Sequence, residues 1–322
     1  MGLFHHTEEQ TTTNGGYYVT SVTLMDAEGR RIGVKPSARQ VLRSGDGDSS
    51  GAITTPVTIQ LDPTVEPTID LPDSVFGRLR NLNLGAGLLH LISAVVMTVI
   101  AADFTLPVTA FHLNGPPGTP VSEGELSVIA DVQLGYLTAG FLYLSALFHA
   151  IIGLLAVSGY RSELRNGRNR FRWVEYSLSS TLMIVTIALL LGTTDLAALI
   201  GIASANVSMI LFGWLMEMAN PPNRARTWWS PFWFGCIAGI GPWLAFVAQI
   251  ATGDESPPGF VWGILVSIFV FFNCFALNQW LQYRRVGRWS DYLFGERTYI
   301  ILSFVAKSAL AWQLYANVLI PD

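Results

Sequence analysis

The stretch SFVAKSALAWQ, Ser303 to Gln313, places one lysine, Lys307, among apolar and small residues. It belongs to an apolar run that is long enough to cross a bilayer, because about 20 helical residues span roughly 30 Å of hydrocarbon. A charge at that depth costs at least about 2.5 kcal/mol, so an intramembrane lysine indicates a function by default. The stretch therefore predicts a transmembrane helix with a functional amine.

Composition favours the same class of protein. Of the 322 residues, 51% are hydrophobic and only 13% are charged, whereas soluble domains carry about 25% charged residues. Cys236 and Cys274 lie within apolar runs, so we interpret them as small buried hydrophobes rather than a disulfide or a metal site. The apolar runs predict an all-α bundle of seven transmembrane helices, at about residues 79–103, 131–158, 171–193, 196–218, 229–252, 258–283 and 291–319.

The arginines of the loops gather on one side of this bundle, before the first helix and after the second, fourth and sixth. The opposite loops and the tail after Trp312 contain no Lys or Arg. Because basic loops stay on the cytoplasmic side, we expect a multi-pass protein of the cell membrane with a cytoplasmic N-terminus and an extracellular C-terminus. The arginines concerned are Arg78, Arg80, Arg161, Arg165, Arg168, Arg170, Arg172, Arg224, Arg226, Arg284, Arg285 and Arg288.

Two segments lie outside the helices. Residues 1–75 are polar and resemble no signal peptide, so we expect a largely disordered cytoplasmic extension before a helical domain at 76–322. A strand pair around Asp26–Gly29 is the alternative for part of that extension. The first outer loop, residues 104–130, has two β-leaning runs around an Asn-Gly-Pro-Pro-Gly turn, which predicts a hairpin in the first extracellular loop. Its exposed edge is a candidate dimerisation surface.

Most ionisable groups of the spans lie near the membrane surfaces. Glu296 and Arg297 stand near the cytoplasmic start of the last helix, where snorkelling or pairing with each other accounts for them. Glu217, Asp103 and Asp131 lie at helix ends, and the interface accounts for these. Four intramembrane groups remain to be explained: Lys307, Glu175, His90 and His149.

Lys307 and Glu175 form a candidate pair. Counting about 1.5 Å per residue, their depths differ by roughly 9 Å, which the two side chains together can span. One interpretation is a buried salt bridge that fixes helix packing. The other is a reactive amine, because desolvation favours neutral lysine, which condenses with an aldehyde to a Schiff base. Glu175 is then the carboxylate placed to serve as counterion.

Aromatic residues of the later helices fit an elongated apolar ligand, although such stripes are more often packing than a cofactor pocket. Together with an intramembrane lysine in a seventh helix, they indicate retinal. The candidates are Met209, Phe232, Trp233, Phe234, Trp243, Trp262, Phe269, Phe271, Phe272, Phe275, Trp280 and Trp312.

The two histidines fall in the same half of the bundle as Glu175. Ser145 lies one turn before His149 on the same helix face, and Ser180 lies about one turn beyond Glu175. A hydrated cavity would collect these groups, whereas two separate core histidines are the plain alternative. A zinc site would need a third ligand, and no intramembrane His or Cys is placed to provide it.

These residues resemble the microbial rhodopsins and, more specifically, heliorhodopsin. The resemblance covers about residues 79–320 and rests on LNGPPGT, RWVEYSLSS, SMILFGWL, PFWFGCIAGI, PGFVWGI and WSDYLFGERTYIILSFVAKSALAWQ. It implies a rhodopsin-like bundle whose N-terminus is cytoplasmic, in agreement with the arginine distribution. It also implies a homodimer to which the hairpin contributes.

At individual positions, the resemblance implies all-trans retinal on Lys307 as a protonated Schiff base, with Glu175 as its counterion. Ser303 stands where ion pumps usually hold a second carboxylate. Further implied roles are a place near the chromophore for Asn206 and Met209, and a place in the proton cavity for His90, His149 and Ser145.

The distribution of carboxylates distinguishes a sensor from a pump. Beyond Glu175 the third helix carries no carboxylate, and neither does the outer half of the seventh, so we expect slow proton return and a slow photocycle. The sequence therefore predicts a light-sensing photoreceptor with a signalling partner, no enzymatic activity and no nucleic-acid binding. The alternatives are a light-driven proton or ion transporter and a membrane hydrolase that uses His90, His149 and a serine; the hydrolase leaves Lys307 unexplained.

Overall fold

The computed structural model describes residues 69–320 and, before them, residues 9–14, 17–22, 24–25 and 31–32. The chain divides into two units, Met1–Pro67 and Thr68–Asp322. In the first unit, β1 (Glu9–Asn14) pairs antiparallel with β2 (Tyr17–Val22), and β3 (Leu24–Met25) with β4 (Arg31–Ile32). The β3–β4 pair flanks the region where the sequence favours a turn. The expectation of a largely disordered extension stays a prediction, since most of that segment lies outside the described residues.

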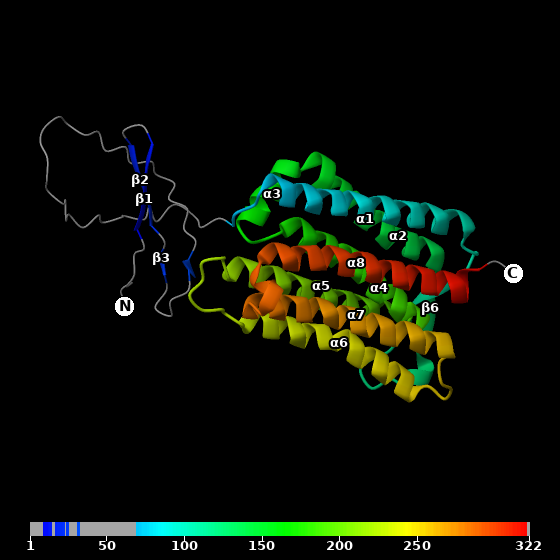
Figure 1. The fold of residues 1–322 in the computed structure, drawn as a ribbon. Helices are drawn as coiled ribbons and strands as arrows, with labels where there is room; N and C mark the ends of the chain where they lie inside the picture. Colours follow the sequence, from blue (N-terminus) through cyan, green and yellow to red (C-terminus); the bar gives the residue numbers. More distant parts are fainter. Residues whose placement is uncertain (1–8, 15–16, 23, 26–30, 33–68, 321–322) are drawn as a thin grey trace, which may run out of the picture. The chain divides into compact units, whose positions relative to one another are not determined.

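The second unit contains seven helices that are long and apolar enough to cross a membrane, as the sequence predicts (Figure 1). The helix α2 continues as a π-helical turn, η2, and α8 continues as η4. A short helix, α3, was not expected from the sequence. The bounds are α1 Asp73–Ile100, α2 Leu134–Ala150 with η2 Ile151–Leu155, α3 Val157–Arg165, α4 Arg170–Leu190, α5 Leu196–Ala219, α6 Ser230–Thr252, α7 Gly259–Arg284 and α8 Tyr292–Leu314 with η4 Tyr315–Leu319.

The first helix begins earlier than its apolar run. Pro72 is the N-cap residue and Asp73 lies in the first turn, where an acidic group complements the helix dipole. The start of α4, the connection between α5 and α6, and the connection between α7 and α8 lie at one end of the bundle, called the arginine-rich end. The arginines there are Arg170, Arg172, Arg224, Arg226, Arg284, Arg285 and Arg288.

The predicted hairpin is confirmed at the other end of the bundle, called the hairpin end. Strand β5 (Thr105–His112) pairs antiparallel with β6 (Glu125–Gln133), with a register shift between Val108 and Thr109; a 3₁₀ turn, η1 (Val121–Glu123), precedes β6. The Thr109 amide donates to the Thr194 carbonyl at 2.9 Å, and the two threonine hydroxyls lie 3.1 Å apart. These contacts fasten the hairpin to the α4–α5 connection.

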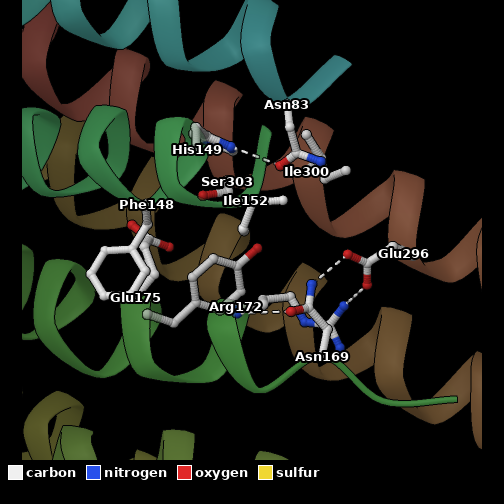
Figure 2. A pocket seen from close by; sticks show the side chains of 11 residues that line it. Asn83, Phe148, His149, Ile152, Asn169, Arg172, Glu175, Glu296, Ile300 and Ser303 are labelled. Carbon is white, nitrogen blue, oxygen red and sulfur yellow. Dashed lines mark hydrogen bonds and ion pairs between the residues drawn. The ribbon is translucent and has the colours of Figure 1, made fainter. Parts of the chain in front are cut away.

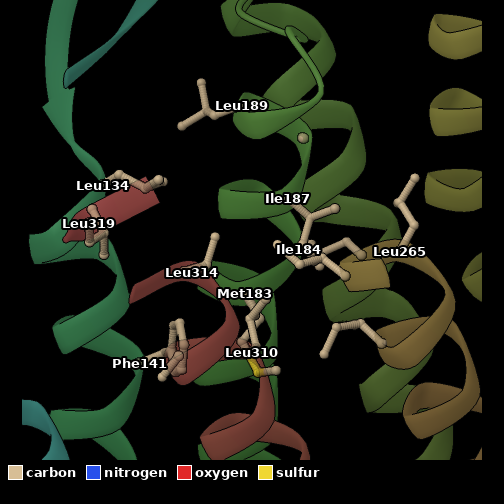
Figure 3. Close-up of a cluster of buried hydrophobic side chains, with 14 of the residues drawn as sticks. Leu134, Phe141, Met183, Ile184, Ile187, Leu189, Leu265, Leu310, Leu314 and Leu319 are labelled. Atoms are coloured by element: carbon tan, nitrogen blue, oxygen red, sulfur yellow. The ribbon is translucent and has the colours of Figure 1, made fainter. Parts of the chain in front are cut away.

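The core near the hairpin end consists of buried apolar side chains from all seven long helices, with one residue each from β5 and η4. Phe141, Met183, Ile187, Leu310 and Leu314 are all at most 2% exposed and pack together (Figure 3). Such packing is the main force between helices in a bilayer, where lipid tails are as apolar as leucine. This cluster fixes the relative positions of α4 and α8, which carry Glu175 and Lys307.

Apolar residues also cover the outer face of the bundle. Cys236 is exposed and Cys274 is half-buried, so the expectation that both are buried is wrong. In a membrane protein, apolar side chains face both the core and the lipid, so apolarity alone does not identify the buried face.

Helices α4 and α5 approach closely at Gly213. A Cβ atom built on this glycine would lie 2.5 Å from the Trp173 ring, and the Trp173 Nε1 is held by the Glu217 carboxylate at 2.6 Å. The ring therefore has little freedom to move away.

We expect Gly213→Ala to lower the free energy of unfolding by about 1–3 kcal/mol, the usual cost of overpacking. Gly201→Ala in the same helix is the matched control, because its Cβ meets nothing within 4 Å and alanine is the better helix former. Thermal unfolding in detergent measures both. Equal midpoints for Gly213→Ala and the wild type would contradict the close approach.

Candidate functional site: a buried lysine and its carboxylate

The structure joins Lys307 of α8 to Glu175 of α4. The two residues are 3% and 5% exposed. The Lys307 Nζ atom donates to Glu175 Oε1 at 2.6 Å and to Ser303 Oγ at 2.8 Å. Ser303 reaches the amine because it precedes Lys307 by one helical turn on the same face.

A third helix contributes to the same carboxylate. Ser145 of α2, which is fully buried, lies with its Oγ 2.7 Å from Glu175 Oε1 and donates to it. The Lys307 Nζ also lies 5.1 Å from the centre of the Tyr176 ring, within range of a cation–π interaction. A buried ion pair needs such additional partners, because desolvation of two charges costs several kcal/mol per ion.

A second charged group, the Arg172 cluster, lies toward the arginine-rich end. The Arg172 guanidinium donates to Glu217 of α5 and to Glu296 of α8. Asn169 supports both carboxylates: its backbone N–H donates to Glu217 at 2.9 Å and its side-chain amide to Glu296 at 2.6 Å. The cluster, defined as Arg172, Glu217, Glu296, Asn169 and Trp173, therefore connects α4, α5 and α8.

This cluster corrects three expectations from the sequence. Glu217 does not face the membrane surface but is 3% exposed, Glu296 pairs with Arg172 rather than with Arg297, and Arg172 is a buried helix residue rather than a loop arginine. A linear count of residues gives depth along a helix but not the face on which a side chain lies. The available signal was that Arg172 precedes Glu175 by three residues, hence on the same face.

A small cavity lies between the Lys307–Glu175 pair and the Arg172 cluster. Its volume is about 20 Å³, and its lining includes Glu175, Ser303, Arg172, Glu296 and His149 (Figure 2). A volume above about 10–15 Å³ is enough for one water molecule when polar partners are present. Residues of both charged groups therefore border the same cavity, together with the apolar side chains of Phe148, Ile152 and Ile300.

Of the predicted cavity residues, the structure brings His149 and Ser145 to this region. The His149 Nδ1 atom lies 2.8 Å from Asn83 Oδ1, and its ring stacks on His90 with centroids 5.9 Å apart and planes at 18°. Within residues 69–320, neither ring nitrogen of the fully buried His90 has a hydrogen-bond partner.

Ser180 hydrogen-bonds to the neighbouring helix α5. Its Oγ accepts a hydrogen bond from the Asn206 side chain of α5 at 2.9 Å, and Thr181 accepts another at 2.9 Å. Ser180 and Asn206 therefore form a polar contact between α4 and α5, and the place of Ser180 in the proton cavity stays a prediction.

The aromatic residues separate into inner and outer groups. Trp243 packs edge-on against Phe272 with centroids 5.9 Å apart, and both are partly buried. Met209 contacts α6, because a Cβ on Gly239 would lie 2.5 Å from its sulfur. Trp312 is 42% exposed, so the expectation that it lines the ligand pocket is wrong: at about 100° per residue, it lies about 140° around α8 from Lys307. Other predicted pocket residues that face outward are Trp233, Phe234, Trp262 and Phe269.

Comparison with known proteins gives a consistent result. A sequence model described as heliorhodopsin matches residues 79–319. No curated protein sequence matches the chain. A cyanorhodopsin from the cyanobacterium Tolypothrix is similar in structure, with a TM-score of 0.53, 12% identity and coverage of 77% of this chain and 96% of the other. A light-driven proton pump from Leptosphaeria maculans gives a TM-score of 0.50, 15% identity and coverage of 77% and 98%. At these identities the two structures show the fold alone.

The Arg172 cluster yields a stability prediction. Arg172→Gln leaves two buried carboxylates without their cation, so we expect a loss of about 3–5 kcal/mol in the free energy of unfolding. The control is Arg170→Gln, whose side chain is 57% exposed; we expect it to change stability by no more than about 1 kcal/mol. Thermal unfolding of both variants is the measurement.

A combined variant distinguishes the cost of the unpaired charges from the cost of the lost arginine side chain. Adding Glu217→Gln and Glu296→Gln to Arg172→Gln removes the unpaired charges, so part of the lost stability should return. A triple variant that is less stable than Arg172→Gln alone would contradict the electrostatic explanation.

Proposed function

Since the chain belongs to the heliorhodopsin family, we propose that it is a light-sensing membrane photoreceptor in which all-trans retinal is bound to Lys307 as a Schiff base. The observation that carries the proposal is the buried Lys307 Nζ at 2.6 Å from Glu175 Oε1. A buried amine next to one carboxylate is what a cationic Schiff base with a counterion requires. The inner aromatic residues Trp243 and Phe272 supply apolar surface for the polyene.

The protein's own groups have separate roles in this proposal. Lys307 attaches the aldehyde with release of water, and Glu175 balances the positive charge that results. Ser145 and Ser303 orient this pair by hydrogen bonds. When bound, retinal supplies absorption of visible light and an isomerisation about its polyene. The charge on Glu175 then controls whether the proton stays at the nitrogen of Lys307.

We infer a slow photocycle and signalling without ion pumping. A pump needs a proton-return group on the far side of the Schiff base, but residues 176–190 of α4 and residues 308–320, which cover the end of α8 and η4, contain no carboxylate. Ser303 occupies the position where the resemblance implies a second acid in pumps. Slow return of the proton to the Schiff base prolongs the deprotonated state, which suits signalling by a shift in the population of conformations. The shared fold with a light-driven proton pump does not oppose this, because fold alone does not determine transport.

The orientation and assembly are also part of the proposal. The one-sided arginines favour a cytoplasmic N-terminus, which puts the Arg172 cluster on the cytoplasmic side and the hairpin outside. The β6 residues Leu126, Val128 and Ile129 are 66%, 60% and 53% exposed, and such a strand face is suited to pairing with a second copy. The protein then acts as a homodimer that passes its signal to a partner, with no enzymatic activity of its own.

The first functional prediction concerns retinal binding. We expect all-trans retinal to give the purified protein a visible absorption band that is absent in Lys307→Ala. Lys35→Ala is the matched control, since it removes the other lysine of the sequence and should leave the band unchanged. Glu175→Gln should shift the band to longer wavelength, because the neutral amide no longer stabilises the ground-state cation as the carboxylate does. A band that survives in Lys307→Ala would contradict the attachment site.

The second functional prediction concerns transport. Illuminated cells that express the protein should show no sustained, protonophore-sensitive change in the pH of the suspension, whereas cells with a known light-driven proton pump, measured in parallel, should show one. A sustained change of pH in the suspension of the test cells would show that the protein is a transporter rather than a sensor.

A further inference from the structure

Asn83 of α1 lies at the centre of a hydrogen-bonded chain that the proposed function does not use. The residue is 2% exposed. Its side-chain nitrogen donates to the Leu79 carbonyl at 3.0 Å and to the Tyr160 hydroxyl at 3.3 Å. Its side-chain oxygen lies 2.8 Å from His149 Nδ1. All the hydrogen-bonding atoms of the amide are therefore occupied.

The partners determine which way the amide points. A backbone carbonyl only accepts hydrogen bonds, so the atom that faces Leu79 must be the nitrogen of the amide. The oxygen then faces His149, and an amide oxygen also only accepts. The hydrogen of the shared bond consequently belongs to His149 Nδ1.

Tyr160 gives independent support for this direction. Burial and the nearby Glu296 carboxylate raise the pKa of the Tyr160 hydroxyl well above its usual value, so the hydroxyl keeps its proton and donates it to Glu296 Oε1 at 3.2 Å. The hydroxyl oxygen is left to accept from Asn83. Donors and acceptors then alternate without conflict from His149 through Asn83 and Tyr160 to Glu296.

The backbone around His149 is also held by α1. A Cβ atom on Gly87 would lie 2.7 Å from His149 Cβ, so the two helices touch at this point. Beyond His149, the π-helical turn η2 begins, and the Arg80 Nε donates to the Gly153 carbonyl within it at 2.7 Å. Asn83, Gly87 and His90 are spaced by four and three residues, which places them on one face of α1. This face fixes both the position and the rotation of the imidazole.

We propose that Asn83 is a positioning residue that fixes neutral His149 as the tautomer protonated at Nδ1, leaving Nε2 as the nitrogen that accepts a proton. The proposal rests on the proposed function for the source of that proton. A proton that leaves a protonated Glu175 forms a bond with Nε2; the carboxyl returns to carboxylate and the neutral ring becomes an imidazolium. The Asn83 oxygen accepts from Nδ1–H in both states, so no rotation of the ring is needed.

The test is the ¹⁵N nuclear magnetic resonance spectrum of His149 in the full chain, labelled at histidine and measured in lipid before retinal is added. The His149 signals are assigned by their loss in His149→Gln. We expect a protonated Nδ1 and an unprotonated Nε2. A spectrum with the proton on Nε2, or with both nitrogens protonated, would overturn the proposal.

Variants test the cause of the preference. Asn83→Leu removes the accepting oxygen and should give a mixture of both tautomers. Asn206→Leu, a buried asparagine on α5 that bonds Ser180, is the matched control and should leave His149 unchanged. An unchanged His149 spectrum in Asn83→Leu would also overturn the proposal. If Asn83→Leu does not fold, the wild-type spectrum still decides the assignment.

Failure of the proposed function has a different signature. The tautomer of His149 is measured without retinal. If no visible band forms after retinal is added, the proposed photoreceptor function is wrong, but the histidine spectrum and the proposed role of Asn83 are unaffected. If the visible band forms but His149 has the opposite tautomer, the proposed photoreceptor function stands and the proposed role of Asn83 is wrong.

Discussion

The buried pair of Lys307 and Glu175 is the interaction on which the arrangement of the helices depends. A cation in the interior of a membrane bundle needs an anion and further hydrogen bonds, because hydrocarbon offers neither. Here the anion comes from α4, and serines of α2 and α8 complete the shell. Any change in the relative position of these three helices would break one of the contacts. The pair is therefore a constraint on the fold as well as the centre of the chemistry that we propose.

The Arg172 cluster joins the helices by buried charges at the arginine-rich end as well. Glu175 and Arg172 lie on one face of α4, while Ser303 and Glu296 lie two turns apart on one face of α8, so the same two helices join both charged groups. The small cavity between them is bordered by residues of both groups and by the apolar side chains of Phe148, Ile152 and Ile300. In our proposal it lies between the site of light absorption and the arginine-rich end of the bundle.

Much of the fold follows from the sequence, because length and hydropathy are enough to place helices in a bilayer. All seven helices and the β5–β6 hairpin were predicted. Each boundary of α5, α6 and α7 agrees with the prediction or differs from it by one residue. The rotation of each helix was not accessible. For this reason the sequence did not reveal that Trp312 and Cys236 face outward. It also assigned Glu217 to the membrane surface, Glu296 to the wrong partner and Arg172 to a loop. Polar spacing was more informative: Ser145 was found from its position one turn from His149, whereas Ser303 was singled out by the family resemblance. The same spacing does not identify the partner of Ser180, which bonds Asn206 of α5.

The central claim is that Lys307 carries the chromophore. The most direct measurement is peptide mass spectrometry after the protein is incubated with all-trans retinal and the imine is reduced with borohydride, which converts C=N to a stable C–N bond. The account predicts a retinyl group on the peptide that contains Lys307, with the peptide that contains Lys35 unmodified. A retinyl group on Lys35 alone, or retinal that remains entirely free after reduction, would contradict it.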